Sequence, residues 1–219
     1  MSNIINFENV SLTYVKRNRL FKNKESFDIL KSLTFSIREG ESLGILGRNG
    51  SGKSTLLQLM CGLIRSNSGR VVNHSASTSL LNLNSGFVEE LTGKENSIFI
   101  GMLMGFSKSN VIQKLPEIAD YAELGEYFNE PLRTYSSGMR SRLGFAISTI
   151  TDPDVLLVDE VLSVGDEKFR IKAEQTMYDR FQSGKTIVFV SHSAEQIERL
   201  CDRALLLDRG ELIMIGDTK

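Results

Sequence analysis

The stretch that decides the fold is "ESLGILGRNGSGKST", residues 41–55. Its first half is a short apolar run typical of a buried strand. In the following "KSTLLQLMCGL", residues 53–63, apolar residues recur at helical spacing, and Gly62 is a stop signal. Between them, "GRNGSGKST" matches the pattern G-x-x-x-x-G-K-[ST]. This loop predicts a phosphate site, because glycines let successive backbone N–H groups point at phosphate oxygens and the helix N-terminus adds positive potential.

The chemistry of the loop assigns roles to its residues. Lys53 reaches the β- and γ-phosphates as a point charge, Ser54 supplies a ligand for Mg²⁺, and Thr55 hydrogen-bonds phosphate. The remaining expected contacts are Gly47, Asn49, Gly50, Ser51 and Gly52. A simple glycine-rich turn is the alternative, but four constrained positions match by chance in about one in a hundred chains of this size or fewer. The sequence therefore predicts a nucleotide site.

Outside the loop, strands and helices alternate. Downstream, "DVLLVDE" (residues 154–160) and "KTIVFVSH" (185–192) are predicted strands, with a helix over about 167–182 between them. A helix around "SAEQIERLC" and a hairpin about Asp208, Arg209 and Gly210 follow. Upstream, "IINFENVSLTYV" and "FDILKSLTFSI" have strand character, and the region from residue 92 to about 150 is helical. Apolar strands separated by helices predict an α/β fold with a parallel sheet covered on both faces.

Two predicted strands end in polar residues. Asp159 and Glu160 follow four apolar residues, at the sheet edge where α/β folds bind ligands. We expect Asp159 to hold Mg²⁺ through water and Glu160 to polarise the attacking water as a general base. Two acids at the end of a strand more often lie in a solvated turn, but a phosphate loop in the same chain makes the Mg²⁺ and base roles the favoured interpretation. For His192, a γ-phosphate contact is favoured over a structural role.

Composition limits the class of protein. The chain has 219 residues, 41% hydrophobic and 24% charged, and a net charge of −1. This is typical of a globular domain and argues against a general nucleic-acid binder, which needs excess Lys and Arg. No run approaches the roughly 18 apolar residues that span a bilayer, and no signal peptide is evident. Cys61 and Cys201 are interpreted as reduced core thiols of a cytosolic protein.

A second helix opens unusually, in "YSSGMRSRLGFAI", residues 135–147. Ser136 or Ser137 can cap it, and Gly138 allows close backbone approach to an anion. A two-fold partner is the simplest way to bring such a helix end to a phosphate already held from one side. We therefore expect it to face the γ-phosphate bound to another copy. An ordinary Ser-capped helix is the alternative.

In their order and spacing, "GRNGSGKST", "YSSGM", "VLLVDEVLSVGD" and "VSH" resemble the nucleotide-binding subunit of an ABC transporter, over essentially the whole chain. The resemblance implies one domain over residues 1–219: a P-loop NTPase core with a mostly parallel sheet, an N-terminal antiparallel β subdomain and an inserted helical subdomain at about 92–150. It also implies ATP and Mg²⁺ as cofactors and a homodimer that ATP closes. Hydrolysis would drive integral-membrane permease subunits through a groove in the helical subdomain.

The resemblance also carries residue roles. Tyr14 is expected to stack on adenine, and Ser136, Ser137 and Gly138 to form the signature loop. Residues 164–166 are expected to cross the dimer axis. The expected catalytic residues are Glu160 as the base, His192 as the switch histidine, and Lys53.

Within the family, "YSSGM", "LTGKEN", "SGMRSRLGFAI" and "DEVLSVGDEKF" are similar to the subgroup that exports O-antigen, capsule or teichoic acid. We therefore expect a peripheral protein at the cytoplasmic face of the inner membrane, with polysaccharide or glycolipid cargo handled by the permease and no nucleic-acid partner. One alternative is the same ATPase driving a lipid, a drug or an imported solute. The other is a soluble ABC-type protein acting on ribosomes or DNA, which usually carries fused domains or coiled coils.

Three features concern the fit to this subgroup. Basic residues over 16–24, where O-antigen exporters carry a short helix near the membrane, form either a solvated loop or a contact with anionic lipid headgroups or a pyrophosphate-linked substrate. No glutamine lies between Gln58 and Gln113, so we hypothesise that Asn82, Asn84 or a water replaces the usual Mg²⁺-binding glutamine near Leu83. The sequence ends at Lys219, and we expect no C-terminal carbohydrate-binding domain.

Overall fold

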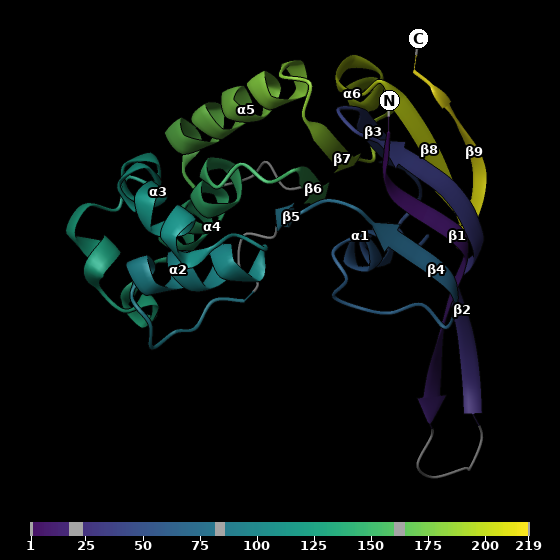
Figure 1. The fold of residues 1–219 in the computed structure, drawn as a ribbon, viewed down its shortest axis with the longest axis horizontal. Coiled ribbons are helices and arrows are strands. Elements are labelled where there is room, and N and C mark those ends of the chain that lie inside the picture. The colour runs from purple at the N-terminus through teal and green to yellow at the C-terminus, as the bar shows by residue number, and fades with distance from the viewer. Residues whose placement is uncertain (1, 18–23, 82–85, 160–164, 219) are drawn as a thin grey trace. The chain divides into compact units, whose positions relative to one another are not determined.

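The computed structural model describes residues 2–17, 24–81, 86–159 and 165–218. The chain forms two compact units (Figure 1). The first unit comprises Met1–Ser75 and Gly184–Lys219, and the second comprises Ala76–Ser183.

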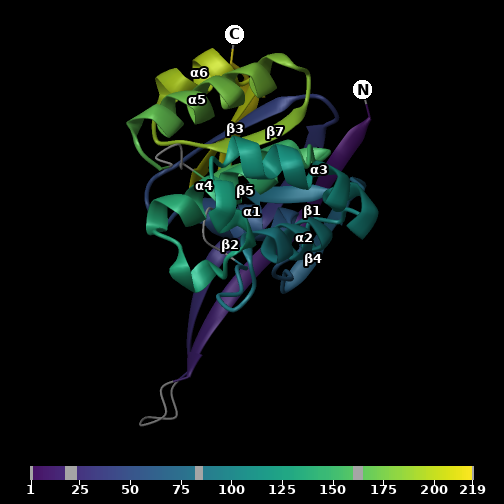
Figure 2. The same cartoon turned by 90° about the vertical axis from the view of Figure 1, so that its left-hand side faces the viewer.

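The first unit contains a three-stranded antiparallel sheet in the order β2-β1-β4. Its strands are β1 (Asn3–Arg17), β2 (Lys24–Arg38) and β4 (Ser68–Asn73). Alternating apolar residues of β1 and β2 form the buried face, where the rings of Phe7 and Phe35 stack 4.6 Å apart. Figures 1 and 2 show β1 and β2 side by side in a long hairpin that extends beyond β4.

Part of the basic segment is strand rather than loop, and the expected contact with anionic lipid headgroups or a pyrophosphate-linked substrate stays a prediction. Lys16, Arg17 and Lys24 lie in strands, because the pairing of β1 with β2 continues through Lys16↔Glu25 and Arg17↔Lys24. Arg19 and Lys22 lie outside the described residues. The hairpin is longer than its apolar pattern predicts because the backbone ladder does not require apolar side chains once the strands leave the core.

The strands of the second sheet that belong to this unit lie in the order β7-β3-β8-β9. They are β3 (Ser42–Leu46), β7 (Thr186–Val190), β8 (Arg203–Asp208) and β9 (Glu211–Asp217). The central strand β3 is parallel to β7 and β8, and β9 is antiparallel to β8. The unit's helices are α1 (Lys53–Met60) and α6 (Ala194–Leu200). A side chain at Gly44 would collide with Ile197, so this glycine lets α6 pack closely on β3.

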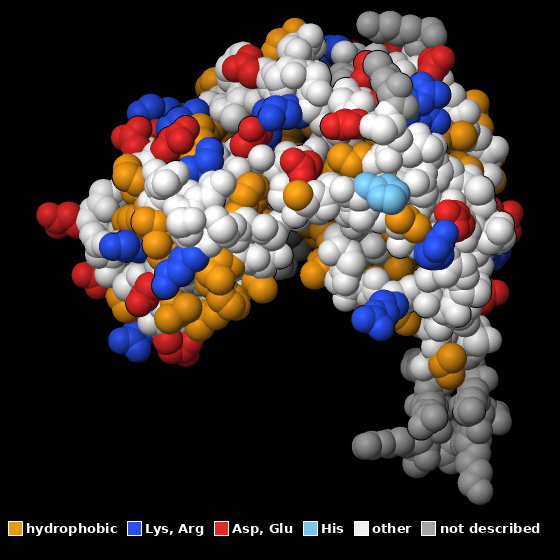
Figure 3. Space-filling view, in the orientation of Figure 1, with side chains coloured by type: hydrophobic (Ala, Val, Ile, Leu, Met, Phe, Trp, Pro, Cys, Tyr) orange, Lys and Arg blue, Asp and Glu red, His pale blue; other side chains and the backbone are white. Residues whose placement is uncertain are grey.

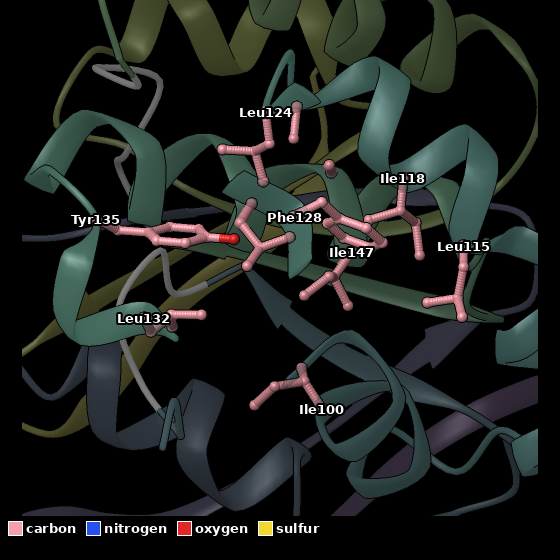
Figure 4. Close-up of a cluster of buried hydrophobic side chains, with 11 residues drawn as sticks. Ile100, Leu115, Ile118, Leu124, Phe128, Leu132, Tyr135 and Ile147 are labelled. Carbon is pink, nitrogen blue, oxygen red and sulfur yellow. The ribbon is translucent and has the colours of Figure 1, made fainter. Parts of the chain in front are cut away.

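The second unit pairs β5 (Thr78–Leu81) with β6 (Val155–Asp159) in parallel. Its helices are α2 (Gly93–Leu103), α3 (Lys108–Tyr121), α4 (Ser137–Ile150) and α5 (Glu167–Gln182), with 3-10 turns η1 (Gly125–Asn129) and η2 (Leu132–Thr134). Figure 4 shows the core that joins α2, α3, α4 and the two turns. Its labelled residues are Ile100, Leu115, Ile118, Leu124, Phe128, Leu132, Tyr135 and Ile147.

The α/β fold class predicted from the sequence is confirmed. The predicted helix over residues 167–182 is α5, and the predicted hairpin is β8–β9. Its turn residues Arg209 and Gly210 have φ values of 47° and 79°, and left-handed backbone at both positions is what a two-residue hairpin turn requires. The single-domain organisation stays a prediction.

Both cysteines are free. Cys201 is buried and Cys61 is partly exposed, and desolvation raises the pKa of each thiol to about 12. The thiols are therefore protonated at neutral pH. Cys201 lies in the core as expected, whereas Cys61 is only partly buried. In the described parts of the chain, no helix combines the length and the apolarity needed to cross a membrane.

The sequence "LTGKEN" forms the start of α2. Thr92 and Glu95 form a capping box, in which hydrogen bonds from the Thr92 backbone and hydroxyl lower the pKa of Glu95. Asn96 is fully buried. Its Oδ1 accepts from the Val88 N–H at 2.9 Å, and its Nδ2 donates to the carbonyls of Val88, Leu91 and Thr92 at 3.0 Å. One side chain therefore holds the whole turn that precedes α2.

We predict that Asn96→Ala lowers the free energy of unfolding by ~1–3 kcal/mol, because it leaves the Val88 N–H without its acceptor and removes the amide contacts to the carbonyls of Val88, Leu91 and Thr92. Denaturant unfolding followed by circular dichroism measures the change. Ser97→Ala is the matched control, since Ser97 is equally buried but makes one hydrogen bond, to the Gly93 carbonyl. We expect that control to cost ~1 kcal/mol. Equal losses in the two variants would contradict the role given to Asn96.

Candidate nucleotide-binding site

The N-terminus of α1 differs from that of every other α-helix in the described part of the chain. Its N-cap is Gly52, with φ 105° and no side-chain cap. The other five helices are each capped by a side chain, from Thr92, Ser107, Ser136, Asp166 and Ser193. The first N–H groups of a helix have no partner within the helix, and together with its dipole they attract anions. The uncapped end of α1 is therefore suited to a phosphate group.

Lys53 begins α1 and is only 7% exposed. Its ammonium turns back into the loop, where Nζ donates to the carbonyls of Gly47 at 2.8 Å and Arg48 at 3.0 Å. These carbonyls hold the positive charge inside the loop. Phosphate oxygens bound by the loop would meet this charge without a large movement of the side chain.

The hydroxyl of Ser51 gives an independent indication of a ligand. Ser51 Oγ is buried and has no hydrogen-bond partner among the described residues. A Cβ at Gly47 would lie 2.6 Å from this oxygen and would collide with the Leu207 carbonyl, so only glycine fits there. The predicted contact residues therefore fit a bound phosphate: an uncapped helix, a buried ammonium and a buried hydroxyl without a partner.

Strand β7 brings His192 to the same sheet edge as the loop. Val190 lies opposite Ile45 in the parallel pairing of β7 with β3, and the Ser191 N–H donates to the Ile45 carbonyl at 3.3 Å. His192 follows directly and is exposed. Of the loop residues, Asn49, Gly50 and Ser54 are exposed, and Thr55 is half-buried.

Gly210, in the turn between β8 and β9, connects the loop to the β1–β2 hairpin. Its N–H donates to the Ser51 carbonyl at 3.1 Å, and its carbonyl accepts from the Lys31 N–H at 2.8 Å. A Cβ at Gly210 would collide with the Ile29 carbonyl. The position of β2 beside the loop therefore depends on a glycine at residue 210.

The second unit holds the other predicted site residues. Asp159 ends β6 and is half-buried. Ser136 caps α4, with Oγ accepting from the Met139 N–H at 3.2 Å, while Ser137 is exposed. The atom nearest to a Cβ at Gly138 would be Ser136 Oγ at 3.8 Å, so this helix end is open to a ligand.

Several predictions fall outside the described residues. These residues are Glu160, Val164, Asn82, Leu83 and Asn84. Of the loop expected to cross a dimer axis, residues 165 and 166 are described, and Asp166 caps α5 by accepting from the Phe169 N–H at 2.9 Å.

The sequence analysis missed the structural role of Tyr135, which precedes the signature loop. Tyr135 is buried, and its hydroxyl donates to the Tyr127 carbonyl at 2.5 Å. The same hydroxyl occupies the space where a side chain at Gly93 would lie, and desolvation raises the pKa of the phenol to about 12. Tyr135 thereby anchors the start of α4 to η1 and α2. The aromatic residue was visible in the sequence, but its contact with Gly93 was not.

Comparison with known proteins decides the family. The model of the ABC transporter family matches residues 30–163. The chain belongs to this family. Its membership confirms the resemblance inferred from the motifs, and with it the expected ATPase activity.

The chain is similar to ATP-binding proteins of two export systems and to a solved ATP-binding cassette. It is 38% identical to the O-antigen export system ATP-binding protein RfbB of Klebsiella pneumoniae, over 100% of this chain and 96% of that protein. It is 41% identical to the teichoic acids export ATP-binding protein TagH of Bacillus anthracis, over 98% of this chain but only 41% of TagH. The ATP-binding cassette MJ0796, solved as a dimer bound to ADP and Pi, has the same fold, with a TM-score of 0.76 at 24% identity over 98% of this chain and 99% of that one.

We predict that Gly210→Ala destabilises this ABC domain and weakens nucleotide binding. The left-handed backbone alone costs ~1–2 kcal/mol with a side chain, and the collision with Ile29 adds to this. Denaturant unfolding and calorimetric titration with ATP measure the two effects. Gly216→Ala is the control on the same hairpin, because a Cβ there meets no atom within 4 Å. A Gly210→Ala protein as stable and as tight-binding as the control would refute the connecting role.

Proposed function

We propose that this chain is the ATP-hydrolysing subunit of a transporter that exports a cell-surface polysaccharide or a lipid-linked O-antigen. The uncapped N-terminus of α1, with Lys53 folded into the loop before it, is the observation that carries ATP binding. The export function is supported by relatives named for O-antigen and teichoic acid export, and RfbB of Klebsiella pneumoniae aligns over nearly its whole length.

The proposed reaction is transfer of the γ-phosphoryl group to water. Lys53 and the first-turn N–H groups of α1 bind the phosphates and stabilise the charge that develops on them. Glu160 accepts the proton of the attacking water, and His192 contacts the γ-phosphate. Ser54 and Asp159 are the residues assigned to Mg²⁺, which when bound neutralises negative charge on the β- and γ-phosphates.

We further propose that two copies close around ATP. Ser136, Ser137 and Gly138 of one copy would contact the γ-phosphate held by the other. The exposed start of α4 supports this arrangement, because its N–H groups and Ser137 hydroxyl are available to a partner. The MJ0796 cassette, which has the same fold, was solved as a dimer.

An exposed apolar surface on α2 supports a membrane-protein partner. Phe99, Met102 and Leu103 lie at spacings of three and four residues, so they share one side of the helix, and all three are exposed. Figure 3 shows hydrophobic side chains gathered over this part of the surface. Such patches mark interaction sites. We propose that the permease subunits bind there and hold the protein at the cytoplasmic face of the membrane.

The variant Glu160→Gln tests the nucleotide chemistry. We expect it to form a stable dimer in ATP and Mg²⁺ and to hydrolyse ATP at least about a hundredfold more slowly, because the general base is lost while binding remains. Size-exclusion chromatography with light scattering and a phosphate-release assay measure the two effects. Glu117→Gln, which changes an exposed residue of α3, should behave as wild type. A Glu160→Gln protein that stays monomeric with ATP would contradict the proposed dimer.

The export function is tested in the cell. Replacing the chromosomal gene by the Glu160→Gln form should remove the polysaccharide from the cell surface and leave lipid-linked polymer inside. Surface staining and extraction of the lipid-linked fraction measure these pools. Unchanged surface polysaccharide would refute the proposed cargo, and a defect in solute uptake would identify an importer instead.

A further inference from the structure

We propose that Phe27 is a second base-contacting residue, which together with Tyr14 forms an aromatic platform for the purine base of the bound nucleotide. The inference rests on the proposed nucleotide-binding function and adds to it a residue from another strand. The motifs of the family assign a base contact to Tyr14 alone, whereas the pairing of β1 with β2 places Phe27 beside it.

Tyr14 and Phe27 are cross-strand neighbours. They lie directly opposite each other in the antiparallel pairing of β1 with β2. Side chains at such positions project on the same face, with Cβ atoms about 4.5–5.5 Å apart. Both are large aromatic residues and both are about half exposed, 49% for Tyr14 and 50% for Phe27. Two adjacent rings with half of their surface in solvent form a surface on which a planar base can stack.

An irregularity in the pairing orients Phe27 toward this face. Leu12 pairs with Leu30, but the next pair is Thr13 with Asp28, so Ile29 is an extra residue in β2. In a regular strand, Phe27 and Leu30 would point to opposite faces, because side chains alternate. The bulge reverses this parity and places Phe27 on the face of Leu30. β-bulges commonly reorient side chains next to binding sites in this way.

The same bulge lies directly against the phosphate loop. A Cβ at Gly52 would be 2.8 Å from Leu30 Cδ2 and 3.0 Å from the Ile29 carbonyl oxygen. Leu30 thus packs over the residue that caps α1. Their partners on β1, Leu12 and Tyr14, are two residues apart, so at about 3.3 Å per residue Phe27 lies about 7 Å further along the hairpin than Leu30. That spacing leaves room for the ribose between the loop and the two rings.

Hydrogen bonds hold this part of the hairpin in place. The Thr13 hydroxyl donates to Asp28 Oδ1 at 2.8 Å, and the Thr13 N–H donates to Asn67 Oδ1 at 2.6 Å. Thr13 directly precedes Tyr14, and Asp28 directly follows Phe27. Both rings therefore extend from a backbone that these hydrogen bonds hold in place. Stacking on such rings does not read the edges of a base. The platform is therefore expected to accept adenine and guanine alike.

Binding of ATP and of inorganic tripolyphosphate separates base contacts from phosphate contacts. For Phe27→Ala we expect ATP affinity to fall about 5- to 30-fold, in the range of one lost stacking contact, with tripolyphosphate affinity unchanged. Tyr14→Ala should behave in the same way. Val15→Ala is the matched control, because Val15 is 55% exposed on the same hairpin but points to the opposite face. It should bind both ligands as wild type does.

A fluorescence variant provides a second measurement that keeps an aromatic ring at the site. The chain contains no tryptophan, so Phe27→Trp introduces a single indole. ATP should quench its emission and tripolyphosphate should not, whereas Val15→Trp should respond to neither. This variant tests the proposal even if Phe27→Ala fails to fold.

The outcomes distinguish the two levels of the proposal. A wild-type protein that binds neither ligand refutes the proposed nucleotide function, and one that binds tripolyphosphate as tightly as ATP refutes the base platform. If wild type prefers ATP and Tyr14→Ala removes that preference, but Phe27→Ala matches Val15→Ala and Phe27→Trp is not quenched, then the role of Phe27 is refuted and the nucleotide site stands.

Discussion

At the N-terminus of α1, the backbone N–H groups of the first turn lack a side-chain acceptor, although the other described α-helices all have one. A helix end without partners is costly unless water or a ligand supplies them. Two neighbouring groups also lack a partner outside the loop among the described residues. Ser51 Oγ is buried without a hydrogen-bond partner, and the Lys53 ammonium donates to carbonyls of its own loop. In the proposed nucleotide complex, one phosphate chain would meet all three needs. The local structure is thus built to be completed by an anion.

The rest of the first unit keeps this incomplete loop in place through its backbone. The Gly210 N–H donates to the Ser51 carbonyl in the loop, and the Gly210 carbonyl accepts from the Lys31 N–H in β2. The bulge at Ile29 then packs Leu30 over Gly52 and turns Phe27 to the same face. Because a Cβ at Gly52 or Gly210 would collide with residues 29 and 30 of β2, this arrangement requires glycine at both positions. The proposed phosphate and base contacts consequently belong to one connected arrangement.

The sequence predicts best those features whose physics is local. The strand, glycine-rich loop and helix over residues 42–60, the helix over residues 167–182 and the Arg209–Gly210 turn each depend on residues adjacent in the chain, and each was predicted correctly. Features that depend on distant partners were missed. The contact of Tyr135 with Gly93 joins residues 42 positions apart, and the bulge that orients Phe27 depends on the register of two strands rather than on either strand's composition. The strands also extend into the basic segment, where apolar periodicity, the signal used to find strands, is missing.

The two helix ends implicated in phosphate binding differ in a way that suits their proposed roles. The end of α1 is uncapped, so its first N–H groups need water or a ligand as partners. The end of α4 is already satisfied by Ser136, which accepts from the Met139 N–H, so α4 is stable whether or not phosphate is present. In a dimer that closes on ATP and opens after hydrolysis, the first end should hold its nucleotide through the cycle. The second must release it without a large penalty, and a helix that carries its own cap can do so because its Met139 N–H keeps the Ser136 hydroxyl as a partner after the phosphate leaves.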